Sequence, residues 1–172
     1  MHLHFRKAEL NDAADLQAVY TKAYLEHFKY LWDDEGEWYL QKNFTLERLI
    51  SELQDPNAIF FLAYFNDVLV GYMKLNVNAP LGDENDGIEL ERIYIIKEAT
   101  GKEIGKELAD LSVEIAKKKG KRFVWLKAMD SSKRAISFYE KMGFHICGSH
   151  SLDFAMMKSE YRGMVIMQKD LN

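Results

Sequence analysis

The hydrophobic and polar positions of the chain follow two periods, one typical of strands and one typical of helices. Residues 88–96 alternate and are rich in β-branched and aromatic side chains, which predicts a strand. After a short polar turn, apolar residues recur at steps of four, three and four: Ile104, Leu108, Leu111 and Ile115. This spacing predicts one face of a helix. We expect the helix to begin near Lys102 and to stop at Gly120, since glycine readily takes the left-handed conformation that ends helices.

The same two periods predict the other elements of an α/β protein. Strands are expected at residues 2–7, 58–65, 68–77, 122–128, 144–151 and 162–169. Helices are expected at residues 12–27, 45–54 and 131–142, and segment 28–39 is expected to be a loop that enters a further helix. Asn66 and Asp67 predict a tight hairpin turn, and Thr45 predicts a helix N-cap. No repeat, linker or low-complexity tract divides the chain, so we expect a single domain, 1–172.

The connection from strand 88–96 to the next helix has the form of a phosphate-binding turn. The first N–H groups of a helix lack partners within it, and the helix dipole adds partial positive charge at the same end. Gly105 would let the backbone approach a bulky anion closely. The turn matches neither the Walker loop nor the G-x-G-x-x-G dinucleotide pattern, and a structural turn that binds nothing is the alternative.

Composition narrows the class of protein. With 48% hydrophobic and 29% charged residues, the chain is typical of a soluble globular domain. The formal net charge of −4 argues against nucleic acid as a partner and suits a cationic substrate. The single cysteine excludes an internal disulfide and a Cys-based zinc site, and the five histidines show no metal-binding spacing, so we expect no metal.

The sequence gives no reason to expect export or a membrane span. Residues 1–7 lack an apolar core of signal-peptide length and no run approaches about 18 apolar residues, so we expect a cytoplasmic location without a membrane span. The lone cysteine fits a reducing compartment. Methionines near the C-terminus suit adaptable packing or a subunit contact, which allows a homodimer.

Two acidic segments are candidates for attracting a cationic substrate. One is segment 28–39, which mixes carboxylates with aromatic residues, and the other is loop 78–87, which has three acids and no base. Carboxylates attract a cation over a distance, and aromatic faces can hold it. The candidate substrate-binding residues are Asp33, Asp34, Glu35, Glu37, Asp83, Glu84 and Asp86. The alternative for both segments is a solvated loop.

Segment 135–144 carries the pattern Ala-x-x-Phe-Tyr-x-x-x-Gly-Phe, and with the order of the elements it resembles the GNAT superfamily of acetyl-CoA-dependent N-acetyltransferases. Within that superfamily the chain is most similar to bacterial spermidine/spermine acetyltransferases of the PaiA type, through residues 88–95, 124–126, 138–144 and 148–151. The resemblance implies a GNAT fold, with a mixed, mostly antiparallel sheet of about seven strands, splayed between strands 4 and 5 and flanked by about four helices. It also implies acetyl-CoA as co-substrate.

The resemblance further implies where the cofactor binds. In the superfamily the turn usually reads Gln/Arg-x-x-Gly-x-Gly/Ala, which falls on Thr100, Glu103 and Gly105, so only the last position matches. A carboxylate beside a pyrophosphate would repel it, so the implied contacts are backbone N–H groups. Ser132 stands where an asparagine is frequent and keeps a hydroxyl. The implied cofactor-binding residues are Ile93, Tyr94, Ile95, Gly101, Lys102, Glu103, Ile104, Gly105, Lys106, Ser132, Ala135 and Lys141.

Three residues receive a chemical role from the resemblance. Tyr139 matches the family tyrosine that lies near the thioester sulfur and gives a proton to the departing thiolate. Glu89 and Glu91 are the candidate bases that deprotonate the amine through water, and Glu91 is preferred because it lies nearer the expected splay. For each carboxylate the alternative is an ion pair, with Arg92 or another base.

These roles imply acetyl transfer from acetyl-CoA to a primary amine, most simply a polyamine such as spermidine or spermine. Another small amine, an amino acid or a peptide is the alternative acceptor. An alternative of a different class is a GNAT-fold protein that binds acyl-CoA without catalysis, as a sensor or regulator. Thr100 and Glu103, which depart from the usual turn, favour that alternative.

Overall fold

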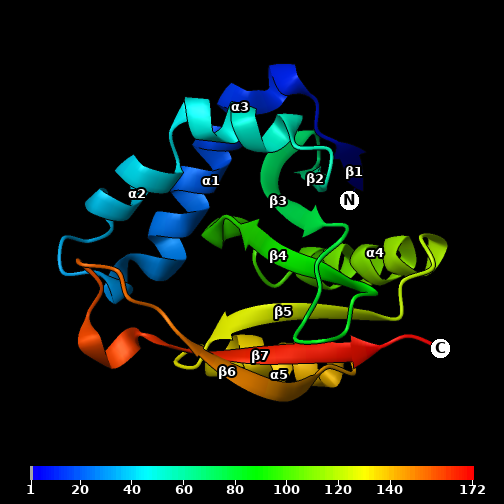
Figure 1. The fold of residues 1–172 in the computed structure, drawn as a ribbon. Coiled ribbons are helices and arrows are strands. Elements are labelled where there is room, and N and C mark those ends of the chain that lie inside the picture. The colour runs from blue at the N-terminus through cyan, green and yellow to red at the C-terminus, as the bar shows by residue number, and fades with distance from the viewer. Residues whose placement is uncertain (1) are drawn as a thin grey trace.

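One seven-stranded sheet lies at the centre of the protein, in a computed structural model that describes residues 2–172 (Figure 1). The strands are β1 (Leu3–Lys7), β2 (Ala58–Phe65), β3 (Val68–Asn76), β4 (Gly87–Ile95), β5 (Phe123–Met129), β6 (His145–Ser151) and β7 (Gly163–Asp170). Their order in the sheet is β1-β2-β3-β4-β5-β7-β6. Neighbouring strands are antiparallel except for β4 and β5, which are parallel. The predicted mixed, mostly antiparallel sheet is therefore confirmed.

Helices cover both faces of this sheet. Within residues 2–172 the five α-helices are α1 (Ala13–Phe28), α2 (Glu37–Asn43), α3 (Leu46–Gln54), α4 (Ile104–Lys118) and α5 (Lys133–Lys141). Tyr94 of β4 contacts Tyr20 of α1, with ring centroids 5.3 Å apart, while the next residue, Ile95, lies beside Gly105 of α4. Successive strand residues point to opposite faces, so α1 and α4 cover opposite faces. Figure 1 shows α4 behind β4, and α5 behind β6 and β7.

Turn and cap residues set several element boundaries as expected. Asn66 and Asp67, with φ of 50° and 65°, form the tight turn between β2 and β3. The Thr45 hydroxyl accepts a hydrogen bond from the Arg48 backbone N–H at 3.1 Å and caps α3. Gly120 takes a left-handed φ of 70° just beyond α4.

Two helices differ from the sequence-based expectation. α4 begins at Ile104 rather than near Lys102, because Glu103 has a φ of 60° and cannot continue a right-handed helix. Segment 37–43 forms α2, the further helix expected after segment 28–39, but it begins at Glu37, inside that segment, and five helices flank the sheet where about four were expected. The carboxylate of Asp34 accepts hydrogen bonds from two backbone N–H groups at the start of this helix and stabilises it.

The hydrophobic core fixes the central strands between the helices. Its largest fully buried side chains include Leu16, Tyr20, Trp32, Leu62, Tyr72, Leu108 and Phe123. They come from α1, α4, β2, β3, β5 and the connection after α1. Close packing of these side chains holds the central strands in fixed relative positions. Polar side chains carried by these strands are therefore positioned rigidly.

The sheet opens between β4 and β5. Parallel pairing joins residues 87–89 to residues 123–125 and then ends. Beyond that point β4 continues alongside β3, and β5 continues alongside β7. The predicted splay between the fourth and fifth strands is confirmed. It leaves one side of β4 without a neighbouring strand beyond Glu89.

A β-bulge accompanies the opening. In the pairing of β3 with β4, Leu75 lies opposite Leu90 and Lys74 lies opposite Arg92. Glu91 is consequently the extra residue on β4. A bulge bends its strand and changes the direction of the side chains around it, so it explains why β4 turns away from β5 at this point.

Candidate active site

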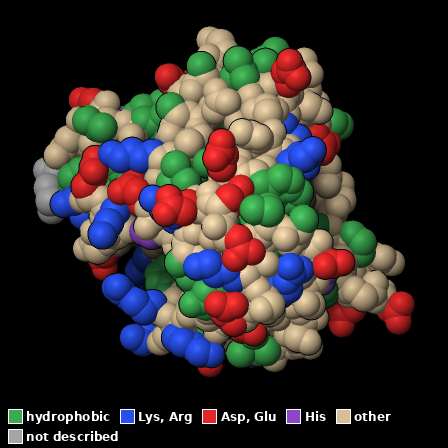
Figure 2. Space-filling model, turned by 90° about the vertical axis from the view of Figure 1, so that its left-hand side faces the viewer, with side chains coloured by type: hydrophobic (Ala, Val, Ile, Leu, Met, Phe, Trp, Pro, Cys, Tyr) green, Lys and Arg blue, Asp and Glu red, His purple; other side chains and the backbone are tan. Residues whose placement is uncertain are grey.

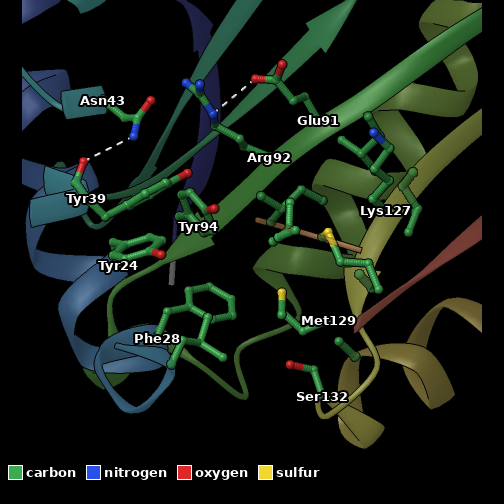
Figure 3. A pocket seen from close by; sticks show the side chains of 18 of the residues that line it. Tyr24, Phe28, Tyr39, Asn43, Glu91, Arg92, Tyr94, Lys127, Met129 and Ser132 are labelled. Carbon is green, nitrogen blue, oxygen red and sulfur yellow. Dashed lines mark hydrogen bonds and ion pairs between the residues drawn. The ribbon is translucent and has the colours of Figure 1, made fainter. Parts of the chain in front are cut away.

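The opening between β4 and β5 leads into a cavity of about 420 Å³ (Figure 3). β4 contributes residues 89–94 to its wall, and β5 contributes residues 126–129. Aromatic side chains from α1 and the segment after it form the opposite wall. Pockets of this size with mostly apolar walls and a few polar groups are typical of small-molecule sites.

Seven of the predicted catalytic and cofactor-binding residues line this cavity: Glu89, Glu91, Ile93, Tyr94, Ser132, Ala135 and Tyr139. They come from β4, from α5 and from the turn before α5. The parallel pairing of β4 with β5 brings these distant segments together, because α5 directly follows β5 in the chain. The two segments that carry the sequence resemblance thus meet at one place.

Tyr139 is held at the cavity by aromatic packing. Its ring meets the rings of Phe138 and Phe144 in edge-to-face arrangements, with centroid distances of 5.0 and 5.5 Å. Burial raises the pKa of Tyr139 to about 12. The hydroxyl therefore keeps its proton at neutral pH and can serve as a proton donor toward the cavity.

Asn76 of β3 brings the two candidate bases together. Its side-chain amide donates hydrogen bonds to Oε1 of Glu89 at 2.9 Å and to Oε1 of Glu91 at 3.1 Å. Burial raises the pKa of Glu89, and this effect exceeds the lowering by the hydrogen bond from Asn76. A carboxylate with a raised pKa accepts a proton more readily at neutral pH, which is what a general base requires.

Glu91 lies in a network of alternating charges. Its Oε2 is 2.9 Å from Nζ of Lys74 and 3.0 Å from Nε of Arg92, and Figure 3 shows the contact with Arg92. The same two cations contact Glu52 of α3 at 2.6 and 2.8 Å. Burial acts to raise the pKa of Glu91, but the positive charges of Arg92 and Lys74 outweigh it, and the pKa is lowered. The ion pair considered as the alternative for Glu91 is present, and Glu89 is the better proton acceptor of the two.

The turn before α4 leaves backbone N–H groups available. The first backbone hydrogen bond of the helix joins the N–H of Glu107 to the C=O of Glu103 at 3.0 Å. N–H groups of residues 104–106 therefore have no partner within the helix. Gly101 and Glu103 take left-handed φ values of 78° and 60°. The side chain of Glu103 is exposed to solvent, so a carboxylate in this position leaves the turn accessible to an anion.

Packing within the protein does not require glycine at position 105. A Cβ placed there would meet its nearest atom, Cδ1 of Ile95, at 3.5 Å, which is an ordinary contact. Ile95 itself lies outside the cavity lining, and its carbonyl accepts a hydrogen bond from Nε2 of His27 at 2.7 Å. That carbonyl is thus already occupied, and Ile93 and Tyr94 are the β4 residues that face the cavity.

The basic residues among the predicted cofactor ligands are exposed. Lys102 lies with Nζ 5.2 Å from the ring centroid of Phe65, Lys106 pairs with Asp110 at 2.9 Å, and Lys141 ends α5 outside the cavity lining. Figure 2 shows a hollow on one side of the molecule, with Lys and Arg side chains gathered at its lower left rim. A basic rim favours an anionic ligand.

Segment 28–39 places its four acids outside the cavity lining. Asp33 and Glu35 border a separate hollow at the end of α1, and Glu35 pairs with Lys29 at 3.1 Å. Asp34 uses its carboxylate at the start of α2, and Glu37 is exposed in the first turn of that helix. These carboxylates therefore serve local structure or face solvent.

Loop 78–87 also lies away from the cavity lining. Asp83, Glu84 and Asp86 are exposed on this loop, which ends at Gly87. Gly87 is where β4 is still paired with β5, at the closed end of the splay. The three carboxylates can act on a ligand in the cavity only through their long-range field.

A contact between two loops closes the aromatic wall, and the sequence contains no signal for it. Trp32 and Met157 form an isolated antiparallel bridge, which joins segment 28–39 to segment 152–158. Phe154 lies in the second segment, with its ring centroid 5.7 Å from that of Trp32. The two segments are more than 100 residues apart in the chain, so only the folded sheet brings them together.

Known proteins similar to this chain are N-acetyltransferases. Residues 16–144 match the model of the Acetyltransferase (GNAT) family. A spermidine N(1)-acetyltransferase of Thermoplasma acidophilum is 29% identical over 163 residues, which cover 92% of this chain and 98% of that protein. An uncharacterised N-acetyltransferase of Lactobacillus delbrueckii subsp. lactis is 28% identical over 114 residues, so this match spans 66% of that relative's length.

Solved structures agree with this family. The PaiA N-acetyltransferase of Thermoplasma acidophilum, solved in complex with coenzyme A, has a TM-score of 0.79 and 25% identity, over 99% of this chain and 100% of that one. An N-acetyltransferase of Staphylococcus aureus Mu50 has a TM-score of 0.77 at 20% identity over all of both chains, which shows a shared fold. Because the family model matches well over half of the residues, the chain belongs to the GNAT family of acetyltransferases, enzymes that use acetyl-CoA.

Proposed function

We propose that the chain transfers an acetyl group from acetyl-CoA to a primary amine at the opening between β4 and β5. The observation that best supports this reaction is the cavity itself, where Tyr139 and Glu89 both reach the space between the splayed strands. Acyl transfer to an amine needs a group that takes a proton from the ammonium and a group that gives one to the leaving thiolate. Burial raises the pKa of Glu89, which favours proton uptake, and raises the pKa of Tyr139 to about 12, which keeps its hydroxyl protonated at neutral pH.

Two parts of the chain suit two parts of acetyl-CoA: the free side of β4 suits the pantetheine arm, and the start of α4 suits the pyrophosphate. The side of β4 that faces away from β3 has no neighbouring strand at Ile93 and Tyr94, so its backbone can hydrogen-bond the amides of a pantetheine arm. Free N–H groups of residues 104–106 suit a pyrophosphate at the start of α4. Ser132 and Ala135 complete the wall beside the arm. When bound, acetyl-CoA supplies the thioester.

Glu89 and Tyr139 each carry out one of the two proton transfers of the reaction. The Glu89 carboxylate accepts a proton from the incoming ammonium through a water molecule and leaves a neutral amine. The Tyr139 hydroxyl donates its proton to the thiolate as it leaves. Backbone N–H groups of β4 beyond the bulge stabilise the negative charge that develops on the carbonyl oxygen. Glu89 thus gains a proton and Tyr139 loses one in each turnover, and solvent restores both.

A polyamine is a second, finer proposal for the acceptor. Its support is the name of the Thermoplasma relative, a spermidine N(1)-acetyltransferase that shares 29% of its residues over nearly its whole length. Residues Asp83, Glu84 and Asp86 would concentrate a polycation near the protein through their field.

Release of coenzyme A in the presence of a panel of amines tests the proposed reaction. The panel should contain spermidine, a simple alkylamine, an arylalkylamine and an amino acid. Acetylation of at least one amine, confirmed by the mass of the product, supports the proposal. Acetyl-CoA that raises the melting temperature but acetylates no amine contradicts it and favours a non-catalytic acyl-CoA-binding protein.

Replacing Tyr139 with phenylalanine should lower turnover at least about tenfold, because the leaving thiolate loses its proton donor. The ring and its contacts with Phe138 and Phe144 are retained, so we expect the melting temperature and the Kd for acetyl-CoA to stay close to those of the unmodified protein. Steady-state kinetics with saturating acetyl-CoA measure the effect. Unchanged turnover would remove Tyr139 from the mechanism.

Replacing Glu103 with glutamine should tighten acetyl-CoA binding about threefold, because an exposed negative charge leaves the phosphate turn. The Glu103→Gly variant should bind at least as tightly, since glycine also takes the φ of 60° without strain. Isothermal titration of both variants measures the change. Weaker binding by both would show that the phosphates lie elsewhere.

A further inference from the structure

The acceptor side of the cavity is an aromatic wall. It is made by Tyr24, Phe28, Trp32, Tyr39 and Phe154. Centroid distances are 4.7 Å between Trp32 and Tyr39 and 5.6 Å between Tyr39 and Phe154. The indole N–H of Trp32 donates to the Tyr24 hydroxyl at 2.9 Å, which satisfies both polar groups. Figure 3 shows Tyr24, Phe28 and Tyr39 together on one side of the cavity, across from Met129.

Backbone hydrogen bonds keep this wall in place. The N–H of Asp33 donates to the C=O of Met156 at 2.8 Å, and the N–H of Lys158 donates to the C=O of Leu31 at 2.9 Å. These bonds flank Trp32, which is 2% exposed. The wall is therefore preorganised and presents flat apolar faces to a ligand without first having to rearrange.

One of the carboxylates on the cavity wall is without an ion pair within residues 2–172. Of the two carboxylates that line it, Glu91 is already paired with Lys74 and Arg92. Glu89 receives a hydrogen bond from Asn76 and forms no ion pair within residues 2–172. Glu89 is thus the lining carboxylate that can contact an ammonium directly, since Lys127 and Lys74 act on it only through their field.

Two further cations line the same cavity. Lys127 and Arg48 are among its lining residues, and neither pairs with a carboxylate in the part of the chain that the structure describes. Nζ of Lys127 lies 5.8 Å from the ring centroid of Trp125. A second ammonium on the ligand would be repelled by these cations. Aromatic rings attract an ammonium of any amine, so the unpaired cations are what discriminate against a polycation.

We propose that the acceptor is a monoamine on an aromatic body, an arylalkylamine, whose ammonium faces Glu89 while its ring packs against the partly exposed rings of Phe154 and Tyr39. This proposal rests on the proposed acetyl transfer and names its substrate class, and it competes with the polyamine suggested by the Thermoplasma relative. The ring buries apolar surface against flat side chains, which supplies binding that a linear polycation cannot obtain there. The single ammonium faces the one lining carboxylate that forms no ion pair within residues 2–172.

A three-substrate comparison tests the proposal. With acetyl-CoA saturating, 2-phenylethylamine, butylamine and spermidine are compared by kcat/KM. We expect the value for 2-phenylethylamine to exceed each of the others at least about tenfold. A higher value for spermidine, or for butylamine, overturns the substrate class and leaves the acetyltransferase proposal intact. No product from any amine, with acetyl-CoA bound, overturns both.

Two variants and one control test whether the substrate preference arises in the cavity. Phe154→Leu should lower the ratio of kcat/KM for 2-phenylethylamine to that for butylamine at least about fivefold, because the ring loses an aromatic face. Phe61→Leu makes the same change on β2, outside the cavity lining, and should leave this ratio unchanged. Lys127→Gln should raise the ratio for spermidine to 2-phenylethylamine at least about fivefold. Ratios that do not move in Phe154→Leu and Lys127→Gln overturn the assignment, and melting temperatures verify that each variant is folded.

Discussion

Replacing Glu89 with glutamine should lower kcat about 100-fold, the lower end of what a positioned general base contributes. Glutamine keeps the shape of the side chain and can still bond to the amide of Asn76, so we expect the fold and acetyl-CoA binding to persist. What is lost is the group that accepts the proton of the ammonium. Steady-state kinetics at saturating concentrations of both substrates measure this loss.

The pH dependence of kcat identifies the base independently. Burial is the largest influence on Glu89, and it raises the pKa of this carboxyl above the ordinary value of 4.5. Because the base works as a carboxylate, kcat should fall as the pH drops through this raised pKa. The Glu89→Gln variant should lack this acidic limb.

Glu91→Gln is the matched control for this experiment. Glu91 is ion-paired with Lys74 and Arg92, which lower its pKa, so the variant should retain the acidic limb. The opposite pattern, a limb that disappears in Glu91→Gln and remains in Glu89→Gln, would make Glu91 the base and contradict our assignment.

Sequence patterns predicted most of the fold because its elements are encoded locally. Asn66 and Asp67 can adopt positive φ, and this local property alone specifies the turn between β2 and β3. Thr45 and Gly120 act within one helical turn of themselves. Glu103 was the local exception, because a glutamate in the left-handed conformation has no signature in the sequence.

The candidate site was predictable only in part, because its electrostatics depend on distant segments. Glu89 and Glu91 were visible from their spacing in a strand, but the bulge and the ion pairs that make them different were not. Glu52 is 40 residues from Arg92 and 22 from Lys74, and the fold alone joins them. A lysine inside the mostly apolar strand β3 was a signal that the sequence did contain.

The distance of the acidic residues from the cavity was not predictable from the sequence. The sequence predicted a substrate-binding role for three acids of loop 78–87, Asp83, Glu84 and Asp86, because this loop has no basic residue. In the structure the loop lies at the closed end of the splay. Charge clusters on loops are most often solvated, and a sequence does not give their distance from a cavity. The aromatic wall was predictable in part, because segment 28–39 is rich in aromatic residues. Phe154 could not be assigned to the wall from the sequence, because only the folded sheet brings it beside Trp32.

Replacing Lys74 with methionine should lower the free energy of unfolding by about 3 kcal/mol, because it leaves two partly buried carboxylates facing one cation. The lysine side chain is 8% exposed and lies 2.6 Å from Glu52 and 2.9 Å from Glu91. Methionine fills a similar volume, so the loss comes from the unbalanced charge rather than from a cavity. Urea denaturation followed by circular dichroism measures the change.

Two controls separate charge balance from packing in this result. Lys118→Met removes a lysine whose side chain is 75% exposed, 3.7 Å from Glu114, and should change stability by less than about 0.5 kcal/mol. The double variant Lys74→Met/Glu52→Leu leaves Arg92 paired with Glu91 alone and restores neutrality. It should therefore be more stable than Lys74→Met by at least about 1 kcal/mol. If the double variant is the less stable of the two, packing around Lys74 rather than charge balance accounts for the loss.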